Sequence, residues 1–160
     1  MSAVATEAGV ATGTAYTHYA SKDELVLAAY LETKAELAAA ATAGVDPSAG
    51  PAERFRSIWF GAHRHLAANR EDALFLLQVD CSPYRAEAHE VAMAGDGDPL
   101  FKQAVTPDIA ERLLPLPLEV LYELGLGPAV RLAASGAELG DGDLGALAGA
   151  CWRAISQPDG

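Results

Sequence analysis

The feature of this sequence that most constrains its fold is the periodicity of its apolar residues. No long run alternates β-branched with polar residues, as half-buried strands do. Ala, Leu and Glu dominate instead, and apolar residues recur at the spacing of a helix face. The clearest stripe contains Phe55, Ile58, Trp59, Ala62 and Leu66. The sequence therefore predicts an all-α protein with eight or nine helices.

Composition narrows the class of protein. The 160 residues are 51% hydrophobic and 21% charged, which is typical of a globular chain that buries a substantial core. No run of 18 apolar residues occurs, so we expect no spanning helix and no membrane partner. The two cysteines, Cys81 and Cys151, form neither a disulfide framework nor a CxxC pair. A reducing, cytoplasmic location is the prediction.

Charge is distributed unevenly along the chain. There are 11 basic and 22 acidic residues, and the net charge of −11 disfavours a chain devoted to nucleic acid. Residues 1–22 hold only Glu7 and Lys22 as charged side chains, so the whole excess of negative charge falls on residues 23–160. Any contact with nucleic acid must therefore lie at the N-terminal end.

Glycine, proline and capping residues divide the chain into helices. Ser21 and Glu24 have the spacing of a capping box, which predicts a long helix from there to about Thr42. Proline suits the first turn of a helix, and glycine breaks helices. Further helices are expected from Pro51, over residues 71–81 with most sides buried, from Thr106, from Leu118 to Ala134 with a bend at Gly125, Gly127 and Pro128, and over residues 143–156.

The first 22 residues have the pattern of a helix-turn-helix. A short helix over residues 2–8 is closed by Gly9, and a second begins near Thr12. Its polar side chains can donate hydrogen bonds to phosphates or base edges. Lys22 follows at the start of the next helix, where a cation suits a phosphate.

The sequence Gly9-Val10-(x2)-Gly13-Thr14-(x)-Tyr16-(x)-His18-Tyr19-(x)-Ser21-Lys22-(x)-Glu24-Leu25 resembles the DNA-binding signature of the TetR family of bacterial regulators. The match is dense over about 25 residues. The stretches 116–128 and 150–155 resemble the terminal helices through which many members dimerise. The resemblance implies a head and connecting helix over residues 1–42, followed by an effector-binding and dimerisation domain over residues 43–160.

The resemblance also implies a mechanism and a set of DNA contacts. A homodimer places two recognition helices in successive major grooves of a near-palindromic, double-stranded operator. A small-molecule effector then changes the spacing of the heads and releases the DNA. Carried onto this chain, Lys22 is a backbone anchor and Tyr19 packs inside the head. The implied recognition-helix contacts are Thr12, Gly13, Thr14, Tyr16, Thr17 and His18.

The family pattern includes a complete helix ahead of the one that begins here at Ser2, and this chain has no room for it. A misplaced start, a truncated domain and an incomplete head with impaired DNA binding are the alternatives. The runner-up hypothesis for function is accordingly a truncated helical protein that keeps ligand binding and dimerisation without DNA binding.

Two sites are expected in the second domain. An apolar effector pocket within residues 52–125 is predicted to be lined partly by Trp59, Phe75, Gln78, Cys81 and Tyr122. The dimer is predicted to form through residues 118–134 and 143–156. Its small residues are Gly125, Gly127, Ala129, Ala133, Ala146 and Ala150, and its apolar residues are Leu118, Leu121, Leu124, Leu144, Leu147 and Ile155.

The residue pattern gives little support to a metal site, a nucleophilic cysteine or catalysis. His63 and His65 are two residues apart and so point to different faces of a helix, and no metal site or cofactor is predicted from the histidines. Cys81 has apolar neighbours and is expected to be a core cysteine rather than a nucleophile. Without a catalytic constellation, an enzyme is not expected.

Overall fold

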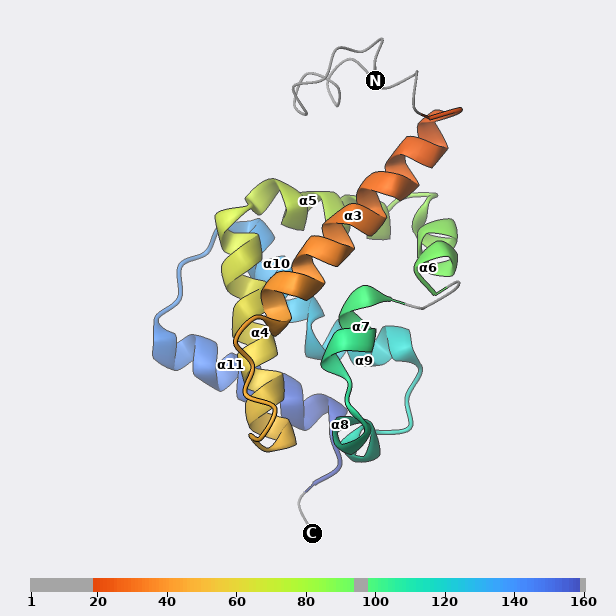
Figure 1. The fold of residues 1–160 in the computed structure, drawn as a ribbon. Coiled ribbons are helices and arrows are strands. Elements are labelled where there is room, and N and C mark those ends of the chain that lie inside the picture. Colours follow the sequence, from red (N-terminus) through yellow and green to blue (C-terminus); the bar gives the residue numbers. More distant parts are fainter. Residues whose placement is uncertain (1–18, 94–97, 159–160) are drawn as a thin grey trace.

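The structure, a computed structural model, describes residues 19–93 and 98–158. The described residues form nine helices and no strand beyond one isolated bridge (Figure 1). This confirms the all-α prediction. The helices are α3 (Lys22–Thr42), α4 (Pro51–Ala68), α5 (Arg70–Asp80), α6 (Arg85–Met93), α7 (Pro99–Ala104), α8 (Pro107–Arg112), α9 (Leu118–Gly125), α10 (Gly127–Ser135) and α11 (Asp141–Ile155).

Local sequence signals account for the starts of five helices and the end of one. The capping box at the start of α3 is present: Ser21 Oγ accepts the amide of Glu24 at 3.1 Å, and Glu24 Oε2 accepts the amide of Ala20 at 2.8 Å. Proline occupies the first turn of α4, α7, α8 and α10. Gly136 ends α10 with φ of +70°, a conformation that side chains with a Cβ rarely adopt.

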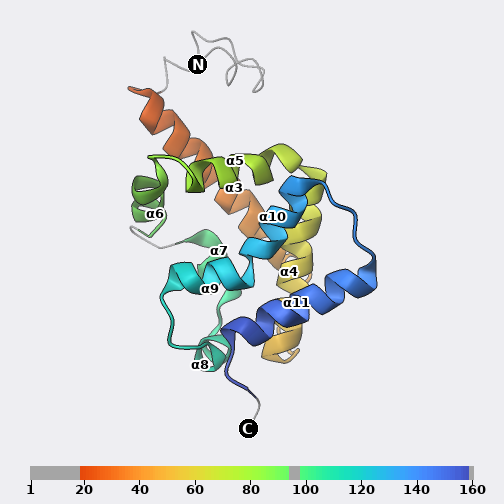
Figure 2. The same ribbon diagram turned by 180° about the vertical axis from the view of Figure 1, so that it is seen from behind.

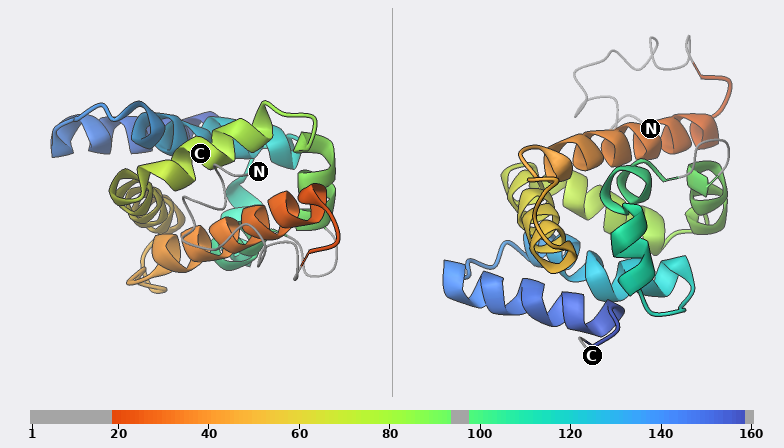
Figure 3. Two further views of the ribbon diagram at one scale, coloured as in Figure 1. Left: turned by 90° about the horizontal axis from the view of Figure 1, so that it is seen from above. Right: turned by 60° about the horizontal axis from the view of Figure 1, so that its bottom comes forward.

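Helix α4 lies in the middle of the bundle. Figure 3 shows α3 on one side of it and α10 and α11 on the other, and α4 packs against all three. Seen from behind, α9, α10 and α11 cross the face opposite α3 (Figure 2). None of the described helices has the length and apolar character needed to cross a membrane.

The apolar stripe of α4 contributes side chains to two hydrophobic clusters. Ile58 and Leu66 join a cluster with residues of α3, α5, α7 and α10. Phe55 and Trp59 join a second cluster with α10 and α11, in which Trp59 is fully buried. Since one helix supplies both clusters, α4 fixes the positions of α3 and α11 relative to each other.

Two predictions about individual helices need correction. The helix expected from Leu118 to Ala134 is two helices, α9 and α10, which meet at Leu126 between two glycines. The helix expected over residues 71–81 is α5, but it is not buried on most sides. Leu74 is 46% exposed and Gln78 is exposed, because α5 packs one face on the bundle and leaves the other at the surface.

Half of the residues expected at a dimer interface are buried by packing within this chain. A methyl group placed at Gly125 would lie 3.2 Å from Ile155 Cδ1, so this glycine lets α9 approach α11. Leu118, Leu121 and Leu147 are half-buried, whereas Leu124, Ala146 and Ala150 are exposed. The buried members are Gly125, Gly127, Ala129, Ala133, Leu144 and Ile155.

Candidate functional site

A cavity of about 390 Å³ lies inside the bundle, bounded by α3, α4, α6, α7, α8, α9 and α11. Leucine, isoleucine and phenylalanine side chains make up much of its wall, for example Phe55, Ile109 and Leu121. Its volume is in the range of sites that enclose small organic molecules. The cavity can therefore hold a mostly apolar ligand.

One buried ion pair gives this cavity a polar feature. Lys34 on α3 is 3% exposed, and its Nζ lies 2.7 Å from Asp98 Oδ2 and 4.6 Å from the centre of the Tyr122 ring. Asp98 also caps α7 by accepting the amides of Leu100 and Phe101. A buried charge needs such partners, so a ligand that displaces Asp98 must itself satisfy the Lys34 ammonium.

Two tyrosines on the cavity wall remain protonated at neutral pH. Burial raises the pKa of Tyr30 to about 12, although the ammonium of Lys34 opposes the shift. Burial also raises the pKa of Tyr122 well above its usual range, and the carboxylates of Asp80 and Asp98 add to the effect. Both phenols are therefore hydrogen-bond donors in a mostly apolar cavity.

Further ionisable side chains lie at the cavity between α6 and α9. His89 on α6 lies 3.3 Å from Asp80 Oδ1 on α5, and Arg131 Nη2 lies 2.6 Å from Glu123 Oε2. Arg85, His89 and Glu123 all belong to the cavity lining. The lining is thus apolar on several helices and charged near α6 and α9.

Helix α3 connects this cavity to the N-terminal end of the described chain. Lys22 is its first residue and is exposed, while Tyr30 and Lys34 line the cavity further along the same helix. Twelve residues of α-helix separate Lys22 from Lys34, which corresponds to about 18 Å. Figure 1 shows this end of α3 projecting from the bundle.

Two family models match the chain. The model for bacterial regulatory proteins of the tetR family matches residues 1–29, and the model for the tetracyclin repressor-like C-terminal domain matches residues 51–156. The chain belongs to the TetR family. The search of curated proteins found no match.

Solved TetR structures resemble the whole chain. A putative transcriptional regulator from Vibrio parahaemolyticus is 30% identical, with a TM-score of 0.63 over 96% of this chain and 86% of that one. A regulator from Haemophilus influenzae Rd is 24% identical, with a TM-score of 0.72 over 96% and 82% of the two chains. One from Marinobacter aquaeolei VT8 is 18% identical, with a TM-score of 0.70 over 97% and 83%. The protein is thus a TetR-family transcription regulator.

Most of the DNA contacts implied by the TetR resemblance fall outside the described residues. These are Thr12, Gly13, Thr14, Tyr16, Thr17 and His18. Lys22 is described, and its exposed position on the first turn of α3 leaves its side chain accessible. Tyr19, which the resemblance predicts to pack inside the head, is half-buried.

The structure separates the five residues predicted to line the effector pocket. Tyr122 lines the cavity, but the other four do not. Trp59 is enclosed in the cluster with α11, and Phe75 packs against the core of α3, α4 and α5. Gln78 and Cys81 are exposed. The prediction that Cys81 is a core cysteine was wrong, because this residue follows the last turn of α5, where the chain turns at the surface.

The fold buries two charged residues, Lys34 and Arg54, that were not predicted as functional residues from the sequence. Lys34 lies four residues after Tyr30 and three before Leu37, so its place on the buried face of α3 was visible in the helical spacing. Arg54 is 6% exposed and pairs with Asp108 on α8, although it does not belong to the apolar stripe of α4. Their partners are distant in sequence, and only the packing of α3 against α7 and of α4 against α8 reveals them.

Proposed function

We propose that this TetR-family regulator is a repressor that binds a near-palindromic operator as a homodimer and is released by a small molecule in the cavity. The observation that carries the proposal is the position of α3. Its first residue, Lys22, lies within residues 1–29, which the tetR-family model matches, and Tyr30 and Lys34 on the same helix line the cavity. A ligand that moves α3 would therefore move whatever precedes Lys22.

The cavity supports an effector with an apolar body and one polar group. Its walls are rich in leucine and isoleucine, and Lys34 with Asp98 forms the buried polar contact on the side of α3. A ligand group that competes for Lys34 would separate Lys34 from Asp98. Because Asp98 also caps α7, the competition would loosen α7 against α3.

On the DNA side, we propose that Thr14, Tyr16 and His18 approach base edges and that Lys22 contacts the flanking phosphates. Thr12, Gly13 and Thr17 complete the recognition helix. The net charge of −11 makes the few basic groups near the head more important, since the rest of the chain repels DNA. The proposed division into a head with connecting helix, residues 1–42, and a ligand-binding domain, residues 43–160, follows from this arrangement.

A titration of the protein against labelled fragments of the neighbouring intergenic DNA, at several salt concentrations, tests the repressor. We expect sequence-preferring, salt-dependent binding. Lys22→Ala should weaken binding to all sequences and reduce the salt slope by about one unit, because one phosphate contact is lost. Arg64→Ala removes an equal charge from the exposed face of α4 and should leave binding nearly unchanged.

The alternative is a ligand-binding and dimerising protein without DNA binding. Extending the chain at its N-terminus with the in-frame upstream codons provides the second arm of the test. If neither form shows sequence-preferring binding to any fragment, the repressor proposal fails and the alternative is favoured.

A further inference from the structure

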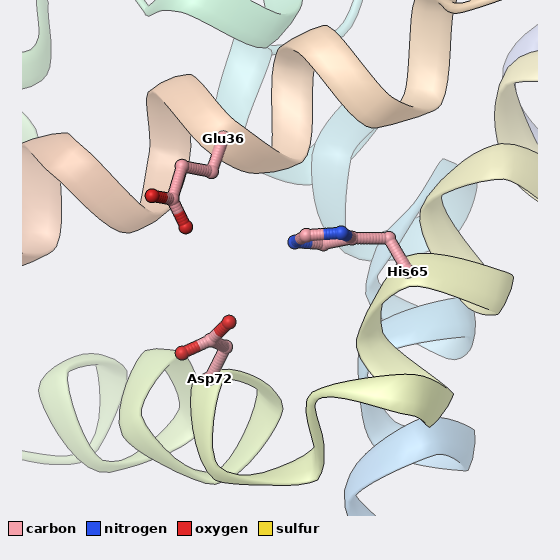
Figure 4. Close-up of side chains that lie close together, drawn as sticks. All are labelled: Glu36, His65 and Asp72. Carbon is pink, nitrogen blue, oxygen red and sulfur yellow. The ribbon is translucent and has the colours of Figure 1, made fainter.

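Three side chains that can ligate a metal converge from three helices outside the cavity. Glu36 comes from α3, His65 from α4 and Asp72 from α5, and one potential ligand atom of each lies within 4.8 Å of the other two. Figure 4 shows the His65 ring directed toward the space between the two carboxylates. The sequence around Glu36 and Asp72 contains no motif that indicates a metal site.

The backbone holds two of these residues in a fixed relation. Helices α4 and α5 meet at the corner residue Asn69, whose backbone amide and side-chain amide both donate to the carbonyl oxygen of His65. The amide of Asp72 donates to the Asn69 carbonyl at 3.0 Å. This tight corner turns the first turn of α5 back toward the last turn of α4, so His65 and Asp72 face each other.

The imidazole of His65 has one nitrogen whose hydrogen-bonding capacity the described residues leave unused. Its Nε2 atom is buried and has no hydrogen-bond partner among the described residues. A buried ring nitrogen without a partner costs free energy, and buried polar atoms in native proteins are nearly always satisfied. The nitrogen therefore has a lone pair or a proton to share with a group that the protein chain itself does not provide.

The two carboxylates create an electrostatic requirement of the same kind. Two carboxylates that face an imidazole ring favour a cation between the three groups. Imidazole and carboxylate together form the donor set that zinc accepts, whereas magnesium and calcium prefer oxygen alone.

We propose that Glu36, His65 and Asp72 bind a divalent transition-metal ion, with Zn²⁺ the best match to the donor set. Zinc–ligand distances of about 2.0–2.2 Å place neighbouring ligand atoms of a tetrahedral site roughly 3.4 Å apart. The three atoms lie within 4.8 Å of one another, so they must converge by up to about 1.4 Å, and Glu36, which is exposed and long, can rotate to do so. Water fills the remaining position, since Glu36 leaves the site open to solvent.

Such an ion would join α3 to α4 and α5 at one point. This site is separate from the effector cavity, because none of its three residues lines that cavity. The proposal is therefore independent of the proposed repressor function, and its failure would leave that function untouched. Its immediate consequence is added stability of the folded chain, since the unfolded chain does not hold the three ligands together.

Isothermal titration of the untagged, chelator-treated protein with ZnCl₂ at pH 7.5 tests the proposal. We expect one Zn²⁺ per chain and tighter binding than for Mn²⁺, with no measurable binding of Mg²⁺. The melting temperature should rise by about 5–10 °C when Zn²⁺ exceeds its Kd about 100-fold. Substitution with Co²⁺ should give the visible absorption of a site with nitrogen and oxygen ligands.

Two variants and a matched control locate the site. Asp72→Asn and His65→Ala should each weaken Zn²⁺ binding by about tenfold or more. Asp72→Asn keeps the size of the side chain, so it remains informative if His65→Ala fails to fold. His63 is on the same helix, but its ring stacks on Trp59 and does not belong to the cluster. His63→Ala should therefore keep wild-type affinity for Zn²⁺. Absence of stoichiometric Zn²⁺ binding, or binding that Asp72→Asn leaves unchanged, overturns the proposal.

Discussion

Gly61 lies where α4 crosses α3 and tolerates no side chain there. A methyl group at this residue would lie 2.7 Å from the carbonyl oxygen of Ala41 and 2.9 Å from its Cα. Both atoms belong to backbone, so neither can turn aside. The close approach of the two helices therefore depends on this glycine.

Gly61→Ala should lower the free energy of unfolding by about 1–3 kcal/mol, because the clash outweighs the better helix propensity of alanine. Urea denaturation measures the effect. Gly142→Ala is the matched control, since that helical glycine has no atom within 4 Å of the added methyl. The control should be neutral or more stable by up to about 1 kcal/mol, and a stabilised Gly61→Ala would contradict the packing described above.

Tyr30 makes stability depend on pH in the alkaline range. Its folded pKa of about 12 exceeds the usual 10.0, so the folded state binds this proton more tightly than the unfolded state does. The contribution to stability is complete below pH 10 and is lost as the pH rises toward 12. Tyr30→Phe should reduce the fall in unfolding free energy over this range by roughly 2 kcal/mol, measured by urea denaturation at several pH values. An identical fall in both proteins would exclude Tyr30 as the cause.

At the scale of elements, a buried arginine attaches the short helix α8 to α4. The Arg54 side chain is 8% exposed, its guanidinium pairs with Asp108, and its Nε is buried with no hydrogen-bond partner among the described residues. Thr106 donates to the other oxygen of Asp108 and, with Arg54, holds the pKa of that carboxyl below its usual range. Removing the carboxylate would leave a buried cation unpaired.

Asp108→Asn should therefore destabilise the protein by about 1–3 kcal/mol in urea denaturation. Adding Arg54→Met should recover part of the loss, because an apolar side chain in that place needs no partner. Glu111→Gln removes the same charge from an exposed position on α8 and should change stability by less than about 0.5 kcal/mol. If the double variant is less stable than Asp108→Asn alone, other groups satisfy the hydrogen-bonding needs of the Arg54 guanidinium.

At the scale of the whole molecule, the proposed dimer must use what the fold leaves exposed. The inward faces of α10 and α11 are occupied by packing on α4, while Ala146 and Ala150 on α11 remain exposed. Small exposed residues on one helix face permit close contact with a partner helix.

Ala150→Arg should weaken the dimer by about tenfold or more, because a long charged side chain would enter a close helix contact. Sedimentation velocity across a range of concentrations measures the change. Ala110→Arg, exposed on α8, is the control and should sediment like the unchanged protein. A protein that is monomeric at micromolar concentration, or a dimer insensitive to Ala150→Arg, would exclude this interface.

The sequence alone determined the class of fold, the boundaries of several helices and the family. Its signals are local: the capping box at Ser21 and the prolines act within one turn, and the apolar stripe of α4 repeats within one helix. The tertiary structure decided which distant residues meet. Lys34 with Asp98, Arg54 with Asp108 and the Glu36–His65–Asp72 cluster each join different helices, so their pairing depends on how those helices cross. Helical periodicity determines the face of the helix on which each residue lies, but only tertiary packing determines which other element contacts that face.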